Sequence, residues 1–322
     1  MHADAMPILF LVHLIAEFPG TIDLAKNRLA ALANVMTQRA CATQSTQWNY
    51  QTLAVSVPNP HVAHVELNRP EKGNAMNLTF WREMVECFKS LGADGDIRAI
   101  VVSGRGKIFT GGLDLVSLTQ EMPDFFDTSK DIGRRAKSLR QTIEQFQQSF
   151  TQIEQCPQPV IAAVHSACVG GGVDLVTACD VRFCSADAYF QVKEVDLGLA
   201  ADVGTLQRLP KIVGNGSFVK DICYTARKVY SQEALDMGIV SRVLATKDSC
   251  VEAALNTAKL IAEKSPVAVQ ATKESINYSR DHPVTDSLNH VRLINQCMLQ
   301  SEDVVKSAEA MLNKETAVYS KL

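Results

Sequence analysis

The sequence predicts an α/β fold followed by a mainly helical C-terminal region. Short apolar runs with the composition of buried strands, such as residues 98–103 and 159–165, lead into glycine-rich turns. Between them lie segments whose apolar residues recur every three or four positions, the spacing of one helix face. The unit strand–strand–helix recurs without close repetition of sequence, and the pattern beyond residue 215 is mainly helical.

The first elements follow a long N-terminal segment. Alternation in residues 50–70 predicts two short strands around a Pro-Asn-Pro turn. Asn77 can cap the helix that follows, in which Trp81, Met84 and Phe88 fall on one stripe. The strand at 98–103 then runs into a turn with the sequence FTGGLD.

A second set of elements carries the other glycine turn. The spacing predicts a helix over 134–155, with Pro157 just beyond its end. The strand at 159–165 is followed by three consecutive glycines and another helix. The stretch DVRFCSADAYFQVKEV predicts two more short strands.

We divide the 322 residues into three parts. Residues 1–48 form an N-terminal extension, 49–250 a core with the active site, and 251–322 a C-terminal helical region. Residues 26–45 are basic, contain no acid and carry Ser and Thr, which is typical of a transit peptide; a disordered extension is the alternative.

The composition excludes several classes of protein. A net charge of −3 does not favour nucleic acid as a partner, and no apolar run reaches the length of a membrane span. Nine irregularly spaced cysteines without a CxxC pair predict neither a metal site nor a disulfide framework. We interpret them as reduced, mostly buried thiols in a reducing compartment.

The two glycine turns are candidates for binding a developing negative charge. Backbone N–H groups of Leu113 and Gly171, one from each turn, could bracket a thioester oxygen as it becomes an enolate. The alternative is that the glycines only permit tight packing. Neither turn has the dinucleotide fingerprint or the P-loop pattern.

Three acids accompany these turns. Asp174 can complement a helix N-terminus, Glu194 can be one charge in a charged stretch, and Asp202 can cap the helix containing TLQRL. Asp202, however, lies in the apolar, glycine-bearing run LGLAADVG, where a solvated charge is not expected. His165, just before the triple glycine, is interpreted as a structural residue at a strand end.

Several motifs together resemble the crotonase (enoyl-CoA hydratase/isomerase) superfamily, and most closely its dienoyl-CoA isomerases. They are HVELNRPEKGNAMN, GKIFTGGLDL, TARKVYSQEALDMGIVSRV, SPVAVQATK and the long block from PVIAAVH to LPKIVG. The resemblance covers about residues 50–322 and implies a crotonase-like spiral of ββα repeats whose C-terminal helices build a trimer, usually paired into a hexamer.

The resemblance also implies roles for individual residues. Leu113 and Gly171 would supply the oxyanion-hole N–H groups, next to Gly112 and Gly170 in the substrate-binding turns. Asn74 and Ala75 would line the adenine end of an acyl-CoA site. The catalytic acids would be Asp174, Glu194 and Asp202; the first two occupy the acid positions of the hydratases, and Asp202 marks the dienoyl isomerases.

The implied activity is the conversion of 3,5-dienoyl-CoA to 2,4-dienoyl-CoA in β-oxidation of unsaturated fatty acids, without a metal or a cofactor, since coenzyme A is part of the substrate. The alternatives are an enoyl-CoA hydratase, a Δ3-Δ2-enoyl-CoA isomerase, and a non-catalytic relative that binds acyl-CoA or RNA. The final Ser320-Lys321-Leu322 matches a signal read by the peroxisomal import receptor. We therefore expect a peroxisomal location, with the mitochondrion as a second one.

Overall fold

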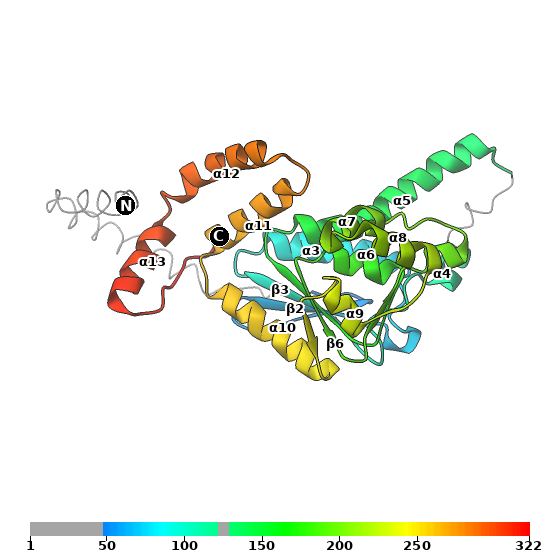
Figure 1. Cartoon of the computed structure of the whole chain (residues 1–322), viewed down its shortest axis with the longest axis horizontal. Helices are drawn as coiled ribbons and strands as arrows, with labels where there is room; N and C mark the ends of the chain where they lie inside the picture. The colour runs from blue at the N-terminus through cyan, green and yellow to red at the C-terminus, as the bar shows by residue number, and fades with distance from the viewer. Residues whose placement is uncertain (1–47, 122–128) are drawn as a thin grey trace. The chain divides into compact units, whose positions relative to one another are not determined.

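The computed structural model describes residues 48–121 and 129–322 (Figure 1). All of them belong to one compact unit, Trp48–Leu322. The predicted N-terminal extension, with its transit-peptide composition, lies outside the described residues apart from Trp48.

Strands and helices alternate over most of this unit, as the sequence predicts. In chain order they are β1 (Leu53–Asn59), β2 (Val62–Leu67), η1 (Pro70–Lys72), α3 (Leu78–Ala93), β3 (Ala99–Gly104), α4 (Leu115–Glu121), α5 (Ile132–Gln155), β4 (Val160–Val164), β5 (Ala167–Val169), α6 (Gly171–Ala178), β6 (Val181–Ser185), β7 (Tyr189–Gln191), η3 (Glu194–Leu197), α7 (Thr205–Val213), α8 (Gly216–Thr225), β8 (Val229–Tyr230), α9 (Ser231–Asp236), β9 (Arg242–Leu244), α10 (Lys247–Ala262), α11 (Pro266–Ser279), α12 (Val284–Met298) and α13 (Glu302–Asn313).

Two sheets form the centre of the unit. The larger has the strand order β1-β2-β3-β4-β6-β9 and is parallel except for the β1–β2 hairpin. The smaller has the order β5-β7-β8. The α/β prediction is therefore confirmed, but the very short strands β5, β8 and β9 were not predicted, because two or three residues establish no period.

The inner strands β3 and β4 of the large sheet are buried on both faces, as in most parallel sheets. Along β3, Ala99 and Val101 pack toward α10, whereas Ile100 and Val102 pack into the larger core on the other face. Figure 1 shows α10 lying along the sheet, with α3 and α6 on the other side. The proposed part boundary at residue 250 falls within α10, so the helices beyond the core start at α11.

Capping side chains determine where the predicted helices α3 and α5 begin. The side chain of Asn77 accepts a hydrogen bond from the backbone N–H of Phe80 at 2.9 Å, which caps α3. The helix α5 begins at Ile132, two residues before its predicted start, because Asp131 caps it. No helix among the described residues is long and apolar enough to cross a membrane.

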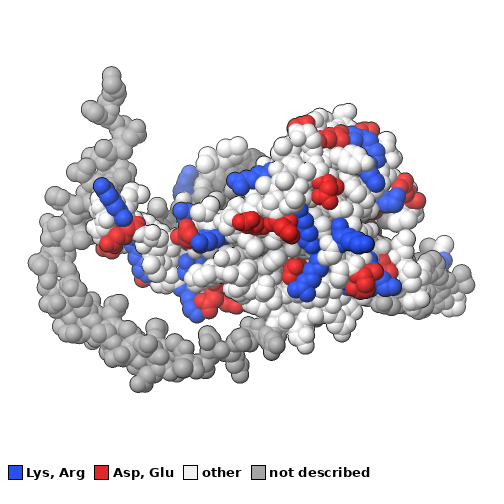
Figure 2. Space-filling model, turned by 90° about the horizontal axis from the view of Figure 1, so that it is seen from below, with Lys and Arg blue, Asp and Glu red and all other residues white. Residues whose placement is uncertain are grey.

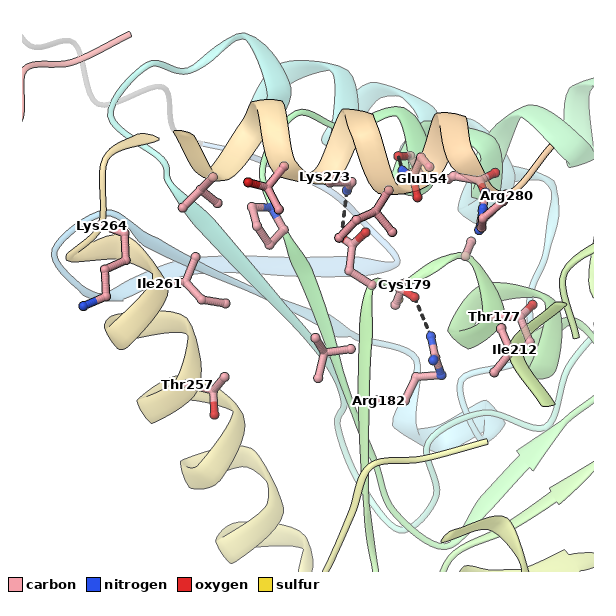
Figure 3. Close-up of a pocket in the computed structure, with 18 of the residues that line it drawn as sticks. Glu154, Thr177, Cys179, Arg182, Ile212, Thr257, Ile261, Lys264, Lys273 and Arg280 are labelled. Carbon is pink, nitrogen blue, oxygen red and sulfur yellow. Dashed lines mark hydrogen bonds and ion pairs between the residues drawn. The ribbon is translucent and has the colours of Figure 1, made fainter. Parts of the chain in front are cut away.

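Helix α11 is anchored to the core by a buried lysine. The Nζ of Lys273 donates to the carbonyl of Gln158 at 3.0 Å and pairs with the carboxylate of Asp180 at 2.7 Å. Figure 3 shows this lysine in the wall of a pocket of about 680 Å³, which also contains residues of α10 and the end of α6. The end of α6 is thus connected to the C-terminal helices.

The thiols agree with the prediction in the described part of the chain. Seven of the cysteines there are buried and Cys297 is exposed, and all eight are free. Cys41 lies outside the described residues.

Candidate active site

The two glycine turns are brought together by main-chain hydrogen bonds. The N–H of Thr110 donates to Ala167 at 3.0 Å, and the N–H of Val169 donates to Thr110 at 3.2 Å. Because β5 pairs with the turn after β3 in this way, Gly112 lies against the other turn: a Cβ placed on it would be 3.6 Å from the nitrogen of Gly171. The predicted proximity of the turns is therefore a feature of the structure.

The backbone N–H groups of Leu113 and Gly171 are available to a ligand. Within residues 48–121 and 129–322, neither group has a hydrogen-bond acceptor. Gly171 is also the first residue of α6, where the helix dipole favours a negative charge. This arrangement can stabilise an oxyanion.

Each member of the triple glycine accommodates a different neighbour. A Cβ on Gly170 would lie 3.3 Å from Oε1 of Glu194, and one on Gly171 would lie 2.9 Å from the sulfur of Met76. A Cβ on Gly172 would lie 2.5 Å from the methyl group of Thr110. Glycine at these positions therefore serves both close packing and, through Gly170, the approach of an acid.

Gly112 offers a direct test of the turn geometry. It has φ 86°, and a Cβ there would lie 2.7 Å from the carbonyl oxygen of Val169, so Gly112→Ala must displace the turn. We expect kcat to fall by about 10²-fold, the effect of losing one oxyanion donor. Gly214→Ala is the matched control, because Gly214 also has a positive φ of 69° but nothing within 4 Å of its added Cβ. Equal activity of the two variants would contradict the role of the turn.

Asn74 anchors the turn rather than pointing to a free surface. Its side-chain oxygen accepts from the N–H of Arg69 at 2.9 Å, and its Nδ2 donates to the carbonyls of Arg105, Ile108 and Phe109. Because its side chain is fully used within the protein, Asn74 has no polar side-chain atom left for a substrate. A contact between Ala75 and the adenine of coenzyme A stays a prediction.

Asp174 is almost completely buried in the first turn of α6. Its Oδ1 accepts a hydrogen bond from the N–H of Thr205 at 2.6 Å, at the start of α7. Burial raises the pKa of Asp174 to about 6, and the charge of Asp202 adds to this, while Thr205 and Arg208 oppose it.

Glu194 begins η3, directly after the small sheet. Its carboxyl group lies against Gly170, and its Oε2 is buried without a hydrogen-bond partner in the described part of the chain. The pKa of Glu194 is raised to about 7. Burial is the largest cause, and the negative charges of Asp174 and Asp202 raise the pKa further. The interpretation of Glu194 as a simple surface charge is therefore wrong.

Asp202 is half-buried in the segment between η3 and α7. It is not the helix cap: that position is Gly204, and no side chain caps α7. Its main-chain carbonyl accepts from Nε2 of Gln147 at 2.7 Å, and burial raises the pKa of its carboxyl group. The three acids thus share one region, and their protonation is coupled.

The buried Asp174 gives a prediction about stability. Its pKa is raised from 3.8 to about 6 in the folded protein, so the folded state holds a proton more firmly than the unfolded state. Its contribution to the free energy of unfolding is therefore greatest below about pH 4 and is lost as the pH rises through about 6. Asn does not titrate.

Relative to wild type, Asp174→Asn should accordingly gain about 2 kcal/mol between about pH 4 and pH 7. Urea unfolding at both pH values measures this gain. Asp196→Asn, at an exposed side chain paired with Lys193, is the control and should stay within about 0.5 kcal/mol of wild type. If the difference in the free energy of unfolding between Asp174→Asn and wild type did not change with pH, the pKa of Asp174 would not be raised in the folded protein.

His165 is structural, as the sequence suggests. Its ring is buried, with Nε2 at 3.1 Å from the carbonyl oxygen of Gly106, and burial lowers its pKa. Among the described residues, no group of three or more His, Cys, Asp or Glu side chains could hold a metal ion.

Sequence reasoning missed the residues that support the acids. Thr205, Gln147 and Arg208 hold Asp174 and the segment around Asp202. The only signal for Thr205 and Arg208 was their place in TLQRL, which begins three residues after Asp202, and Gln147 had no signal.

Paired glycine turns with two free N–H groups beside buried acids provide the groups that a reaction through an enolate requires. The chain matches the model of the enoyl-CoA hydratase/isomerase family over residues 58–321. It therefore belongs to this family, the crotonases, as its motifs indicated.

Similar proteins within this family include two dienoyl-CoA isomerases. The chain is 54% identical to the human mitochondrial Δ(3,5)-Δ(2,4)-dienoyl-CoA isomerase over 310 residues, covering 95% of this chain and 94% of that protein. It is 42% identical to the peroxisomal Δ(3,5)-Δ(2,4)-dienoyl-CoA isomerase of Arabidopsis thaliana, covering 86% of this chain and all of the relative. The crystal structure of the enoyl-CoA hydratase from Bacillus anthracis superposes with a TM-score of 0.75 at 27% identity, covering 84% and 99% of the two chains.

Proposed function

We propose that this protein is a Δ3,5-Δ2,4-dienoyl-CoA isomerase of fatty-acid oxidation. The proposal is supported by the third acid: the charges of Asp174 and Asp202 both raise the pKa of Glu194, whose carboxyl group lies against Gly170, next to the free N–H group of Gly171. The names of the relatives from human and Arabidopsis support the same activity.

The reaction requires two proton transfers at separated carbons. A base removes a proton from carbon 2, and the electrons of that C–H bond form a C1=C2 double bond while the thioester oxygen becomes the oxyanion of a dienolate. When this oxyanion reverts to the carbonyl, the C1=C2 electrons form the C2=C3 double bond. The C3=C4 electrons move to C4=C5, and those of C5=C6 take a proton at carbon 6. Carbons 2 and 6 are four bonds apart, so one carboxylate cannot easily serve both.

We assign the proton at carbon 2 to Glu194 and the proton at carbon 6 to Asp202. Glu194 has a pKa raised to about 7 and can therefore accept a proton near neutral pH. Burial also raises the pKa of Asp202, the acid that would deliver the proton at carbon 6. Asp174 orients and electrostatically biases the pair, and Leu113 and Gly171 stabilise the thioester oxygen of the dienolate.

Every step of this proposal uses only the acids and backbone N–H groups of the protein and the thioester substrate. Coenzyme A is part of that substrate and not a separate cofactor. Purified protein mixed with 3,5-octadienoyl-CoA should produce the ultraviolet absorbance of a diene conjugated with the thioester. Absence of this change, together with rapid hydration of crotonyl-CoA, would instead identify a hydratase. Rapid conversion of a 3-enoyl-CoA alone would identify a Δ3-Δ2-enoyl-CoA isomerase.

An RNA-binding role has less support. Figure 2 shows one face of the molecule on which Lys and Arg side chains are interspersed with Asp and Glu rather than gathered into a basic stripe. An RNA gel shift at physiological salt, performed beside the isomerase assay, separates the two functions.

We also propose that the chain forms a homotrimer or a pair of trimers through its C-terminal helices. These helices expose large apolar side chains, and the largest exposures belong to Val284, Met311 and Leu312. Exposed apolar surface of this kind is typical of an interface. Sedimentation of the full chain should give a trimer or hexamer, and Met311→Ser with Leu312→Ser should weaken it; a monomeric wild type would contradict the proposal.

The location follows the relatives, which are named mitochondrial in human and peroxisomal in Arabidopsis. We propose the peroxisome, with the mitochondrion as a second location. Recognition of Ser320-Lys321-Leu322 by the import receptor stays a prediction, which a fluorescent fusion with and without these residues tests.

A further inference from the structure

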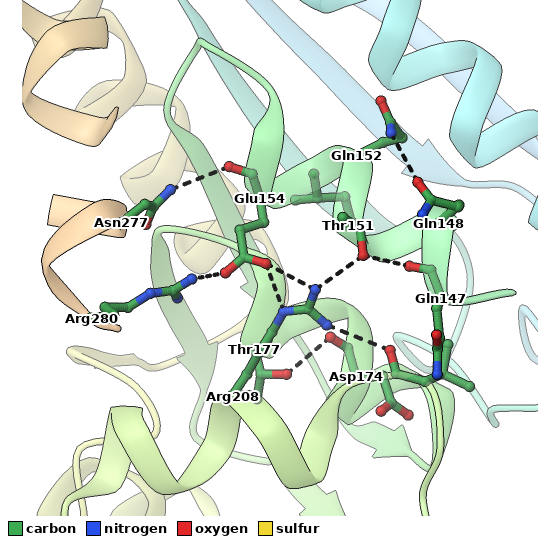
Figure 4. A network of polar contacts seen from close by, with 12 residues as sticks. Gln147, Gln148, Thr151, Gln152, Glu154, Asp174, Thr177, Arg208, Asn277 and Arg280 are labelled. Carbon is green, nitrogen blue, oxygen red and sulfur yellow. Dashed lines mark hydrogen bonds and ion pairs between the residues drawn. The ribbon is translucent and has the colours of Figure 1, made fainter. Parts of the chain in front are cut away.

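One face of α5 supports the segment that carries Asp202. Gln147, Thr151 and Glu154 are spaced by four and three residues, so they lie on one side of the helix. Gln147 donates to the carbonyl of Asp202 at 2.7 Å, while Thr151 and Glu154 contact Arg208 of α7 (Figure 4).

Arg208 folds back over the residues that follow Asp202. Its Nη1 lies 3.5 Å from the carbonyl oxygen of Val203, and a Cβ added to Gly204 would collide with the same nitrogen. The guanidinium group therefore covers the backbone directly after Asp202.

Glu154 fixes this guanidinium group. Its Oε2 accepts from Nε of Arg208 at 3.1 Å and from Nη2 at 2.9 Å, and the two side chains are only 18% and 11% exposed. A largely buried charge pair of this kind has a defined geometry, which an exposed pair lacks. The second oxygen of Glu154 pairs with Arg280, the residue that caps the end of α11.

The Asp202 segment has little other support on this side. A cavity of about 330 Å³ lies here, lined by Gln147, Glu154, Val203 and Arg208 together with further, mainly polar residues. Because apolar packing does not fill this space, the polar contacts hold this side of the backbone of residues 202–204, in addition to the packing of Val203 against the core.

We propose that Arg208, held by Glu154, is a positioning residue that sets the place of Asp202 for proton delivery. The inference rests on the proposed isomerase function and deepens it. Arg208 does not touch the reacting carbons; it acts on the second proton transfer through the backbone of Val203 and Gly204. Among the described residues Arg208 makes no hydrogen bond to Glu194, so the first transfer does not use this contact. The charge of Arg208 does lower the pKa of Asp174, and Arg208→Lys keeps that charge.

The test separates the two transfers. Full-length Arg208→Gln and Glu154→Gln are assayed with 3,5-octadienoyl-CoA for isomerisation and, in deuterium oxide, for exchange of the carbon 2 hydrogen. We expect kcat of isomerisation to fall about 10- to 100-fold in both variants, as for misplaced catalytic groups, while exchange at carbon 2 stays within about two-fold of wild type.

Lys211→Gln is the matched control, because Lys211 lies on the same helix and pairs with Asp281 at an exposed site. It should leave both rates unchanged. In the Asp202→Asn background, Arg208→Gln should cause no further loss of isomerisation, since the two residues then act as one unit.

Unchanged isomerisation in Arg208→Gln, or a parallel loss of isomerisation and exchange, would overturn the positioning role. If Arg208→Gln does not fold, Arg208→Lys replaces it, because lysine keeps the charge but not the forked donors of the guanidinium group. Arg208→Lys must then lose isomerisation while it retains exchange at carbon 2. A wild-type protein without isomerase activity would instead refute the proposed function itself.

Discussion

Asp202→Asn should abolish the isomerisation of 3,5-octadienoyl-CoA, with a loss in kcat of about 10²- to 10⁴-fold, the usual contribution of a general acid. Asn has nearly the same shape as Asp but no carboxyl proton to deliver to carbon 6. Because the half-buried Asp202 does not cap α7, the substitution removes no helix cap. Stopped-flow ultraviolet absorbance measures the loss.

A second measurement on Asp202→Asn makes the result specific. Glu194 remains in place, so exchange of the carbon 2 hydrogen with solvent should continue. Asp196→Asn is the control, since this neighbouring acid lies on the exposed side of η3 in a pair with Lys193. Retention of full isomerase activity by Asp202→Asn would refute the assignment of the third acid.

Glu194→Gln should stop the reaction one step earlier than Asp202→Asn does, at the removal of the proton from carbon 2. Without a base at carbon 2, both isomerisation and hydrogen exchange should fall by about 10²- to 10⁴-fold. The amide also keeps the volume beside Gly170, where the Glu194 carboxyl group fits closely. Loss of isomerisation with full exchange would mean that Glu194 serves carbon 6 instead.

The pH dependence of the wild type belongs to the same prediction. Glu194 must be ionised to accept a proton and has a pKa raised to about 7, so kcat/KM should decrease as the pH falls below about 7. Because the neighbouring Asp174 and Asp202 contribute to this shift, the measured value describes the coupled group. The small residual activity of Glu194→Gln should lose this acid limb.

The fold class could be predicted, and candidate site residues could be named, because both depend on local patterns. Apolar periodicity defined α3 and α5, and glycines at two strand ends indicated Leu113 and Gly171. Asp202 could be singled out because a solvated charge is not expected in an apolar, glycine-bearing run, whereas the roles of Asp174 and Glu194 came from the resemblance to the family.

The parts that could not be predicted depend on contacts between distant residues. The pairing of Thr110 with β5 brings the glycine turns together, yet β5 is too short to have a period. Asn74 looked like a ligand-binding residue because the motif gives its position, whereas its four side-chain hydrogen bonds depend on folding of the turn. A cap of α7 was the alternative to a catalytic role for Asp202, but the helix begins at Thr205, so Gly204 takes the cap position.

The three consecutive glycines have a practical consequence for altering which acyl chains the protein accepts. Each one faces a different obstacle, namely a carboxylate, a thioether and a methyl group, so no single compensating change would make room for side chains at all three. Libraries aimed at new substrates should leave Gly170, Gly171 and Gly172 untouched and diversify other walls of the site. In such a library, survivors with a larger residue at position 172 should also carry a smaller one at Thr110.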